Sequence, residues 1–162
     1  YTPLKKITWL NTSIGSIPGA LPIIGGWTAS SGSIDVMAWV LFAIMYLWQH
    51  PHFYSIAWIC RSDYAEAKLK MLPVVEPDGN STIRQIFWHL LLMIPITFLP
   101  FIQGALGLFY LIGAFMITSA FFVSALPLAR NRSDKSALLL LKASVFYLPS
   151  LLLIIIIDKG VL

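Results

Sequence analysis

The sequence has few charged residues and a single cysteine, and each shortage excludes some classes of protein. Aspartate, glutamate, lysine and arginine make up 11% of the 162 residues, against about 25% in soluble domains. This composition excludes an ordinary soluble domain. Cys60 alone can form neither a disulfide within the chain nor a cysteine-only metal cage. The basic residues are dispersed along the chain, which argues against a nucleic-acid partner.

Apolar residues dominate instead, at 58% of the chain and a mean hydropathy of +0.80. They form five runs that reach the roughly 20 residues needed to cross a hydrocarbon layer of ~30 Å. Helices are expected, because open sheet edges are not stable in lipid. We predict an all-α, multi-span transmembrane helical bundle, with residues 1–162 forming a single membrane domain in a lipid bilayer. The five predicted spans are Ile7–Ala29, Ile34–Ile59, Ile83–Ile102, Ala105–Leu128 and Ser136–Ile157.

The connections between the spans alternate between basic and non-basic, which predicts the topology. Lys5 and Lys6 precede the first span, and basic residues recur in 61–84 and 130–135 but are absent from 28–33 and 101–104. By the positive-inside rule the amino end, a cytoplasmic cap loop at 61–82 and the Arg130 connection share the cytoplasmic side. The carboxyl end, with Asp158 and Lys159, is then on the opposite side.

The second span carries polar residues that share one face. On a helical wheel Gln49, His52 and Asp63 fall within roughly 80° of one another, together with Met45, Ile56 and Cys60. An amide or imidazole inside a span is costly unless it faces a cavity or a partner, so we predict that Gln49 and His52 face the interior. The alternative for His52 is a neutral imidazole bonded to a neighbouring helix, and for His50 this alternative is favoured. The two histidines point to different faces, which argues against a zinc pair.

A charged rim lies where this span meets water. Asp63 and Glu66 are one helical turn apart, which is also the pattern of an ordinary solvated helix end. The amino-terminal stretch supplies the opposite charge: if it is helical from its start, one face carries Tyr1, Lys5, Thr8, Thr12, Gly15 and Gly19. Lysines at a span entrance are commonly topology anchors. The functional alternative is an anion site, because Mg²⁺ binds carboxylates together with substrate phosphates and cations stabilise a departing diphosphate.

Five short motifs follow one another over roughly the first half of the chain. They are Tyr-Thr-x-Leu-Lys-Lys-x-Thr-x-x-Asn from Tyr1, Ile-Pro-Gly-Ala-Leu-Pro from Ile17, Trp-Gln-x-Pro-His-Phe from Trp48, Arg-x-Asp-Tyr from Arg61 and Met-Leu-Pro-Val from Met71. In this order and spacing they resemble the UbiA-type intramembrane prenyltransferases and, among them, the family of protoheme IX farnesyltransferases. The remaining spans match only in being apolar and similarly spaced.

The resemblance implies a nine-helix bundle and an enzyme that transfers a farnesyl group from farnesyl diphosphate to a vinyl group of haem B, giving haem O. It implies Mg²⁺ bound with the diphosphate, and a contact with haem A synthase. The host membrane is expected to be the bacterial cytoplasmic membrane, with the mitochondrial inner membrane as the alternative. A membrane transporter or channel subunit, or a non-catalytic haem-binding membrane protein, is the alternative function.

The same resemblance assigns roles to residues. Asp63 is the expected Mg²⁺ ligand, and Asp63, Lys5 and Lys6 form the expected catalytic set, with the lysines contacting the diphosphate. Gln49 and His52 are expected to contact the tetrapyrrole. The complete expected substrate-binding set is Tyr1, Thr8, Asn11, Gln49, His52, Arg61 and Tyr64.

The chain departs from the family pattern in two respects. Lys68 stands where glycine is expected after the Asp-Tyr pair. The first acidic motif of the family, Asn-x-x-x-Asp-x-x-x-Asp, is not found in these residues. Only half of the expected metal site is therefore present. We expect the chain to be the C-terminal portion of a longer prenyltransferase and to be inactive alone.

Overall fold

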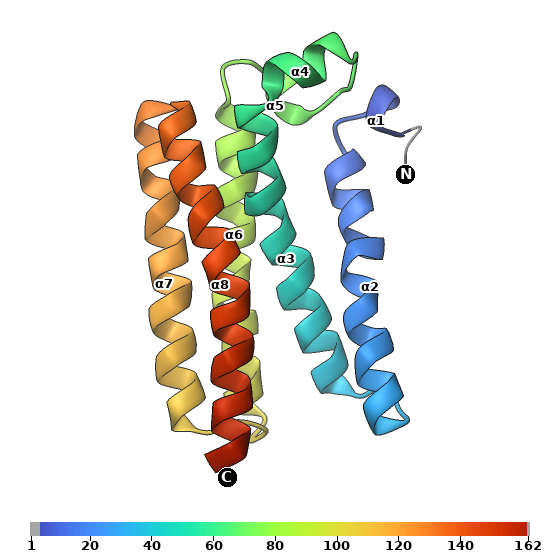
Figure 1. Ribbon diagram of the computed structural model, residues 1–162, viewed down its shortest axis with the longest axis vertical. Helices are drawn as coiled ribbons and strands as arrows, with labels where there is room; N and C mark the ends of the chain where they lie inside the picture. Colours follow the sequence, from blue (N-terminus) through green and yellow to red (C-terminus); the bar gives the residue numbers. More distant parts are fainter. Residues whose placement is uncertain (1–3, 162) are drawn as a thin grey trace.

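The computed structural model describes the backbone of residues 4–161 and the side chains of residues 4–159. Over this range the chain forms helices joined by short connections, which confirms the all-α prediction. Five long helices run up and down, and the short helices lie at one end of them (Figure 1). The helices are α1 (Leu4–Ile7), α2 (Asn11–Ser31), α3 (Val36–Ile59), α4 (Arg61–Glu66), α5 (Leu72–Val75), α6 (Asn80–Ile102), α7 (Leu108–Asn131) and α8 (Asp134–Val161).

The two ends of the bundle differ in charge. Helices α1, α4 and α5 and the α7–α8 turn lie at one end, which we call the basic end, and the chain terminates at the other (Figure 1). The expected grouping of the basic connections is therefore confirmed as a feature of the fold. The residues that give the basic end its name are Lys5, Lys6, Arg61, Lys68, Lys70, Arg84, Arg130, Arg132 and Lys135.

The predicted spans match the long helices with shifts of up to four residues at their ends. The largest shift at a helix start is at α2, which begins at Asn11, so the described part of the amino-terminal stretch forms two separate helices, α1 and α2, rather than one. Side-chain bonds interrupt it: Leu10 N donates to Thr8 Oγ1 at 3.2 Å, and Asn11 Nδ2 donates to the Thr8 carbonyl at 2.7 Å. Such local bonds compete with the helical pattern.

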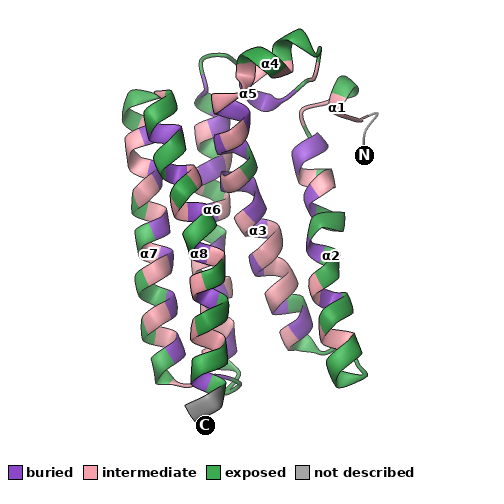
Figure 2. Ribbon diagram, in the orientation of Figure 1, coloured by how far each residue is buried: buried purple, intermediate pink, exposed green. Residues whose placement is uncertain are grey.

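Three of the long helices, α6, α7 and α8, are long and apolar enough to cross a membrane. Helices α2 and α3 have the length but are interrupted by polar residues that face each other, including Ser16 and Gln49. The outer surfaces carry large apolar side chains, such as Phe115 at 57% and Phe146 at 73% exposed, whereas buried residues lie on the sides that face neighbouring helices (Figure 2). This distribution fits an apolar surrounding.

The core lies among α3, α6, α7 and α8, which pack around one another, while α2 packs mainly against α3. Hydroxyl groups join these helices inside the core. The Tyr110 hydroxyl donates to the Thr97 carbonyl at 2.7 Å, and the Tyr147 hydroxyl lies 3.4 Å from Thr97 Oγ1 and 3.3 Å from Thr118 Oγ1. Bonds of this kind link helices in lipid, where the burial of apolar surface contributes little to association.

Asp158, in the last turns of α8, caps the start of α7. It is 3% exposed, and its carboxylate accepts hydrogen bonds from Gly107 N at 2.6 Å and Tyr110 N at 2.9 Å. Helix α7 begins after Gly107, which offers no side chain of its own for capping. The negative charge also interacts favourably with the amino-terminal end of the helix dipole. Asp158 therefore joins the last helix to the α6–α7 turn.

We predict that Asp158→Ala destabilises the protein by about 2 kcal/mol, because it leaves two backbone N–H groups without their acceptor. Thermal unfolding in detergent measures the effect as a lower midpoint. Asp134→Ala is the matched control: it removes a carboxylate that is 57% exposed and forms a surface ion pair, so a change below about 1 kcal/mol is expected. Equal midpoints for the two variants would contradict the capping role.

Candidate functional site

A pocket of about 210 Å³ opens at the basic end, between α2, α3 and the short helices. Three residues of the predicted substrate-binding and catalytic sets, Lys5, Gln49 and Tyr64, line it. They come from α1, α3 and α4, so separate parts of the chain converge on one cavity. The full lining is Lys5, Thr12, Gly15, Gly19, Gln49, Phe53, Tyr64 and Met71.

The face predicted for the amino-terminal stretch is largely preserved in the pocket. Lys5, Thr12, Gly15 and Gly19 all line it, although α1 and α2 are separate helices. Thr8 does not, because its hydroxyl and carbonyl form the turn between them. Lys6 is exposed outside the lining, and Tyr1 lies outside the described residues.

Gln49 joins α3 to α2 at the deeper side of the pocket. It is 4% exposed, and its Nε2 donates to the Ser16 carbonyl at 3.1 Å and to the Met45 carbonyl at 3.3 Å. The amide packs directly against Gly19, where any Cβ atom would overlap the Gln49 side chain. Glycine at this position thus allows α3 to present an amide to the cavity.

Two hydrogen bonds fasten the amino-terminal segment to the loop after α4. Lys70 N donates to the Lys5 carbonyl at 2.7 Å, and Asn11 Nδ2 donates to the Lys70 carbonyl at 3.1 Å. Asn11 is fully buried. Its amide nitrogen is thus used inside the protein, and a contact between Asn11 and the diphosphate stays a prediction. The bonds hold Lys5 beside the residues that follow Lys70, including Met71 of the pocket.

Asp63 does not continue the face of α3, so that expectation is wrong. Helix α3 ends at Ile59, the backbone of Cys60 is non-helical, and α4 starts a new helix. Arg61 turns toward α8, where its guanidinium donates to Asp134 Oδ1 at 2.5 Å and forms a surface ion pair. Asp63 is exposed at the basic end, one residue before Tyr64 of the pocket.

His52 faces α8 rather than the α2 side on which Gln49 lies. Its Nδ1 donates to Ser144 Oγ at 2.8 Å, since the Ser144 hydroxyl donates to the Leu141 carbonyl at 2.6 Å. The ring also stacks on Trp48 at 4.7 Å. The prediction of one shared face is therefore wrong for these two residues, because a separation of 60° on the helix is enough to direct them to different neighbours. Haem contact by His52 stays a prediction.

His50 is a buried histidine bonded to a neighbouring helix, as the favoured interpretation expects. Its Nδ1 donates to the Tyr46 carbonyl at 2.9 Å, and its Nε2 lies 3.2 Å from Ser13 Oγ on α2. The ring stacks on His89 of α6 with centroids 3.6 Å apart. His89 could not be predicted from the sequence, because a single histidine in an apolar span carries no signal of its partner.

Lys68 has φ of 55°, in the left-handed region that favours glycine. The backbone at this position therefore retains the conformation for which glycine is expected. Gly79, just before α6, has φ of 75° and faces the Trp58 ring so closely that a Cβ atom would collide with it. Both positions shape the turns that hold α4 and α5 against the end of the bundle.

The described residues contain no group of three or more histidine, cysteine, aspartate or glutamate side chains placed to hold a metal ion. Asp63 and Glu66 are exposed carboxylates on α4, near the pocket. One or two carboxylates suffice for Mg²⁺ when substrate phosphates and water supply the other ligands. The residues present thus fit part of such a site.

The chain is similar in sequence to protoheme IX farnesyltransferases from bacteria. A protoheme IX farnesyltransferase of Solibacter usitatus is 44% identical over 159 residues, covering 98% of this chain and 54% of the relative. One of Salinibacter ruber is 42% identical over 158 residues, covering 98% of this chain and 56% of the relative. The chain spans about half the length of the curated relatives it matches.

A solved structure, described as digeranylgeranylglyceryl phosphate synthase in membranes, has a similar fold. The TM-score is 0.72 at 19% sequence identity, and the match covers 79% of this chain and 46% of that chain. The sequence profile of the UbiA prenyltransferase family matches residues 1–149. Together with the apolar helices α6, α7 and α8, this match identifies an integral membrane protein. The chain belongs to the UbiA prenyltransferase family.

Proposed function

We propose that the protein transfers a farnesyl group from farnesyl diphosphate to a vinyl group of haem B, giving haem O. The observation that supports this proposal most is the pocket at the basic end, which Lys5, Gln49 and Tyr64 line from three helices. The similarity to protoheme IX farnesyltransferases supports the same reaction. Against a transporter, most of the carboxylates and lysines lie at the basic end rather than near the middle of the spans.

Lys5 and Thr12 are the groups in the pocket suited to a diphosphate. An ammonium group stabilises the negative charge that grows on the diphosphate as the farnesyl carbon–oxygen bond breaks. Lys6 adds positive charge at the same end of the bundle, and Tyr64 also lines the pocket. Arg61 would contact substrate only after leaving its ion pair with Asp134. Mg²⁺ bound with the diphosphate would be held by Asp63 and would neutralise further charge.

The apolar part of the pocket suits the farnesyl chain. Phe53, Met71 and the glycine face of α2 offer a surface with little competition from water. The farnesyl C1 atom bonds to the terminal vinyl carbon, water adds to the inner vinyl carbon, and one proton is released. Gln49 borders this cavity, and His52, one turn further along α3, is our candidate on the tetrapyrrole side.

We also propose that the basic end faces the cytoplasm of a bacterium, with residues 61–82 as a cap loop over the pocket. The positive-inside rule supports this orientation, and the bacterial sources of the two relatives support the membrane. In a mitochondrion the corresponding side would be the matrix. A contact with haem A synthase would deliver haem O to the next enzyme.

Asp63→Ala is predicted to lower haem O formation by about 100-fold or more, because charge neutralisation at the departing diphosphate is lost. The measurement is haem O formed by the full-length protein from haem B, farnesyl diphosphate and Mg²⁺, and removal of Mg²⁺ should abolish it. Glu76→Ala, which removes an exposed carboxylate outside the pocket lining, is the control and should stay near wild type.

Unchanged turnover in a folded Asp63→Ala protein would contradict the assignment of Asp63. Haem O formed by the 162-residue chain alone would contradict the need for the first acidic motif. Stoichiometric, axially ligated haem without any prenyl transfer would favour a non-catalytic haem-binding protein instead.

Gly19→Ala is predicted to lower kcat/KM about tenfold, because the new Cβ displaces the Gln49 amide and costs about one hydrogen bond. Gly25→Ala is the matched control on the same helix, since a Cβ atom there meets nothing within 4 Å. Steady-state kinetics with gel filtration separate lost activity from lost folding. Equal kcat/KM values for the two variants would contradict a role for the Gln49 amide in the reaction.

A further inference from the structure

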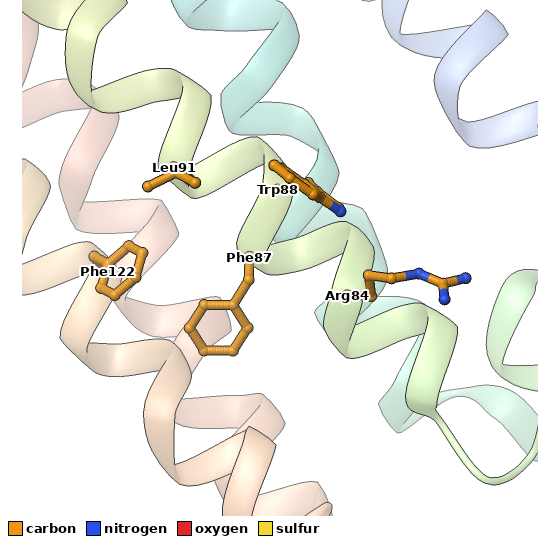
Figure 3. A pocket seen from close by; sticks show the side chains of 5 residues that line it. All are labelled: Arg84, Phe87, Trp88, Leu91 and Phe122. Carbon is orange, nitrogen blue, oxygen red and sulfur yellow. The ribbon is translucent and has the colours of Figure 1, made fainter.

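An open pocket of about 250 Å³ lies between α6 and α7, apart from the proposed active site. It faces outward, since Trp88 is 55% and Leu91 is 51% exposed. Figure 3 shows the side chains that line it, four from α6 and one from α7. They are Arg84, Phe87, Trp88, Leu91 and Phe122.

The surface of the pocket is apolar, and the polar groups of Arg84 and Trp88 lie at its edge. Phe87 and Phe122 pack edge to face across the two helices, with centroids 5.4 Å apart. Arg84 and Trp88 are four residues apart and share one side of α6. In Figure 3 the guanidinium of Arg84 and the indole nitrogen of Trp88 extend to the same side, away from the phenylalanine rings.

Within the described part of the chain no carboxylate forms an ion pair with Arg84. Its Nη2 donates to Ser81 Oγ at 3.0 Å. A guanidinium has five N–H donors, so most of them are available to an anion. Arginine binds two phosphate oxygens with two parallel hydrogen bonds, so a phosphate group is a suitable ligand for Arg84 at the edge of the pocket.

The depth of these residues matches the boundary between headgroups and acyl chains. Helix α6 starts at Asn80 at the basic end, so Arg84 lies about 6 Å and Trp88 about 12 Å along its axis. Tryptophan favours this boundary, and basic residues there attract anionic lipids. We propose that the pocket binds one anionic phospholipid of the adjoining leaflet, with its phosphate on Arg84 and an acyl chain over Phe87, Leu91 and Phe122.

Native mass spectrometry of the purified protein, titrated with phosphatidylglycerol or phosphatidylcholine, tests the proposal. Wild type should retain phosphatidylglycerol in preference to phosphatidylcholine. Arg84→Gln should weaken phosphatidylglycerol retention about fivefold, the effect of about 1 kcal/mol per basic residue near a lipid surface. Arg130→Gln is the matched control, because it removes the same charge from an exposed position at the same end but outside the pocket.

Leu91→Trp is a second variant that fills the pocket and keeps the charge, so it should also weaken retention. It decides the question if Arg84→Gln does not fold. Equal weakening by Arg84→Gln and Arg130→Gln would overturn the proposal in favour of general attraction to the basic end. No preference of wild type for phosphatidylglycerol, or full retention in Leu91→Trp, would overturn it as well.

Discussion

The pocket at the basic end depends on the hydrogen bonds that join Lys5, Asn11 and Lys70. Lys70 N donates to the Lys5 carbonyl of α1, and the Lys70 carbonyl accepts a hydrogen bond from the buried Asn11 amide at the start of α2. Because a buried amide without partners is costly, these bonds specify one arrangement of the loop. They bring the wall formed by α1 and Met71 against the wall formed by α2 and α3.

The second constraint is the close approach of α2 and α3 at Gly19 and Gln49. Helix α2 packs mainly against α3, whereas α3 also belongs to the four-helix core. Helix α3 therefore connects the pocket to that core. Gln49 and His50 form hydrogen bonds with α2, and His52 forms one with α8. Apolar side chains cover the outside, so the polar groups of the spans are directed inward.

The sequence predicted the helices well, because membrane thickness sets the length of apolar runs. It also grouped Lys5 with Gly19 correctly, since both line the pocket although they lie on separate helices. The sequence did not predict contacts between side chains and residues that are distant in the chain. The bend at Cys60 separated Asp63 from the face of α3, and the bonds of Asp158 to the α7 start have no local signature. At Lys68 the family pattern predicted the backbone rather than the side chain. The pattern has glycine there, and Lys68 adopts the left-handed conformation that glycine favours.

Hydrogen–deuterium exchange in Asn11→Ala tests most directly whether these bonds assemble the pocket. Loss of a buried hydrogen bond should speed exchange of the Lys70 amide and its neighbours, residues 68–72, about tenfold. Exchange in α6, α7 and α8 should stay unchanged. Full protection of Lys70 in the folded variant would contradict the account, because the loop would then be held in place without Asn11.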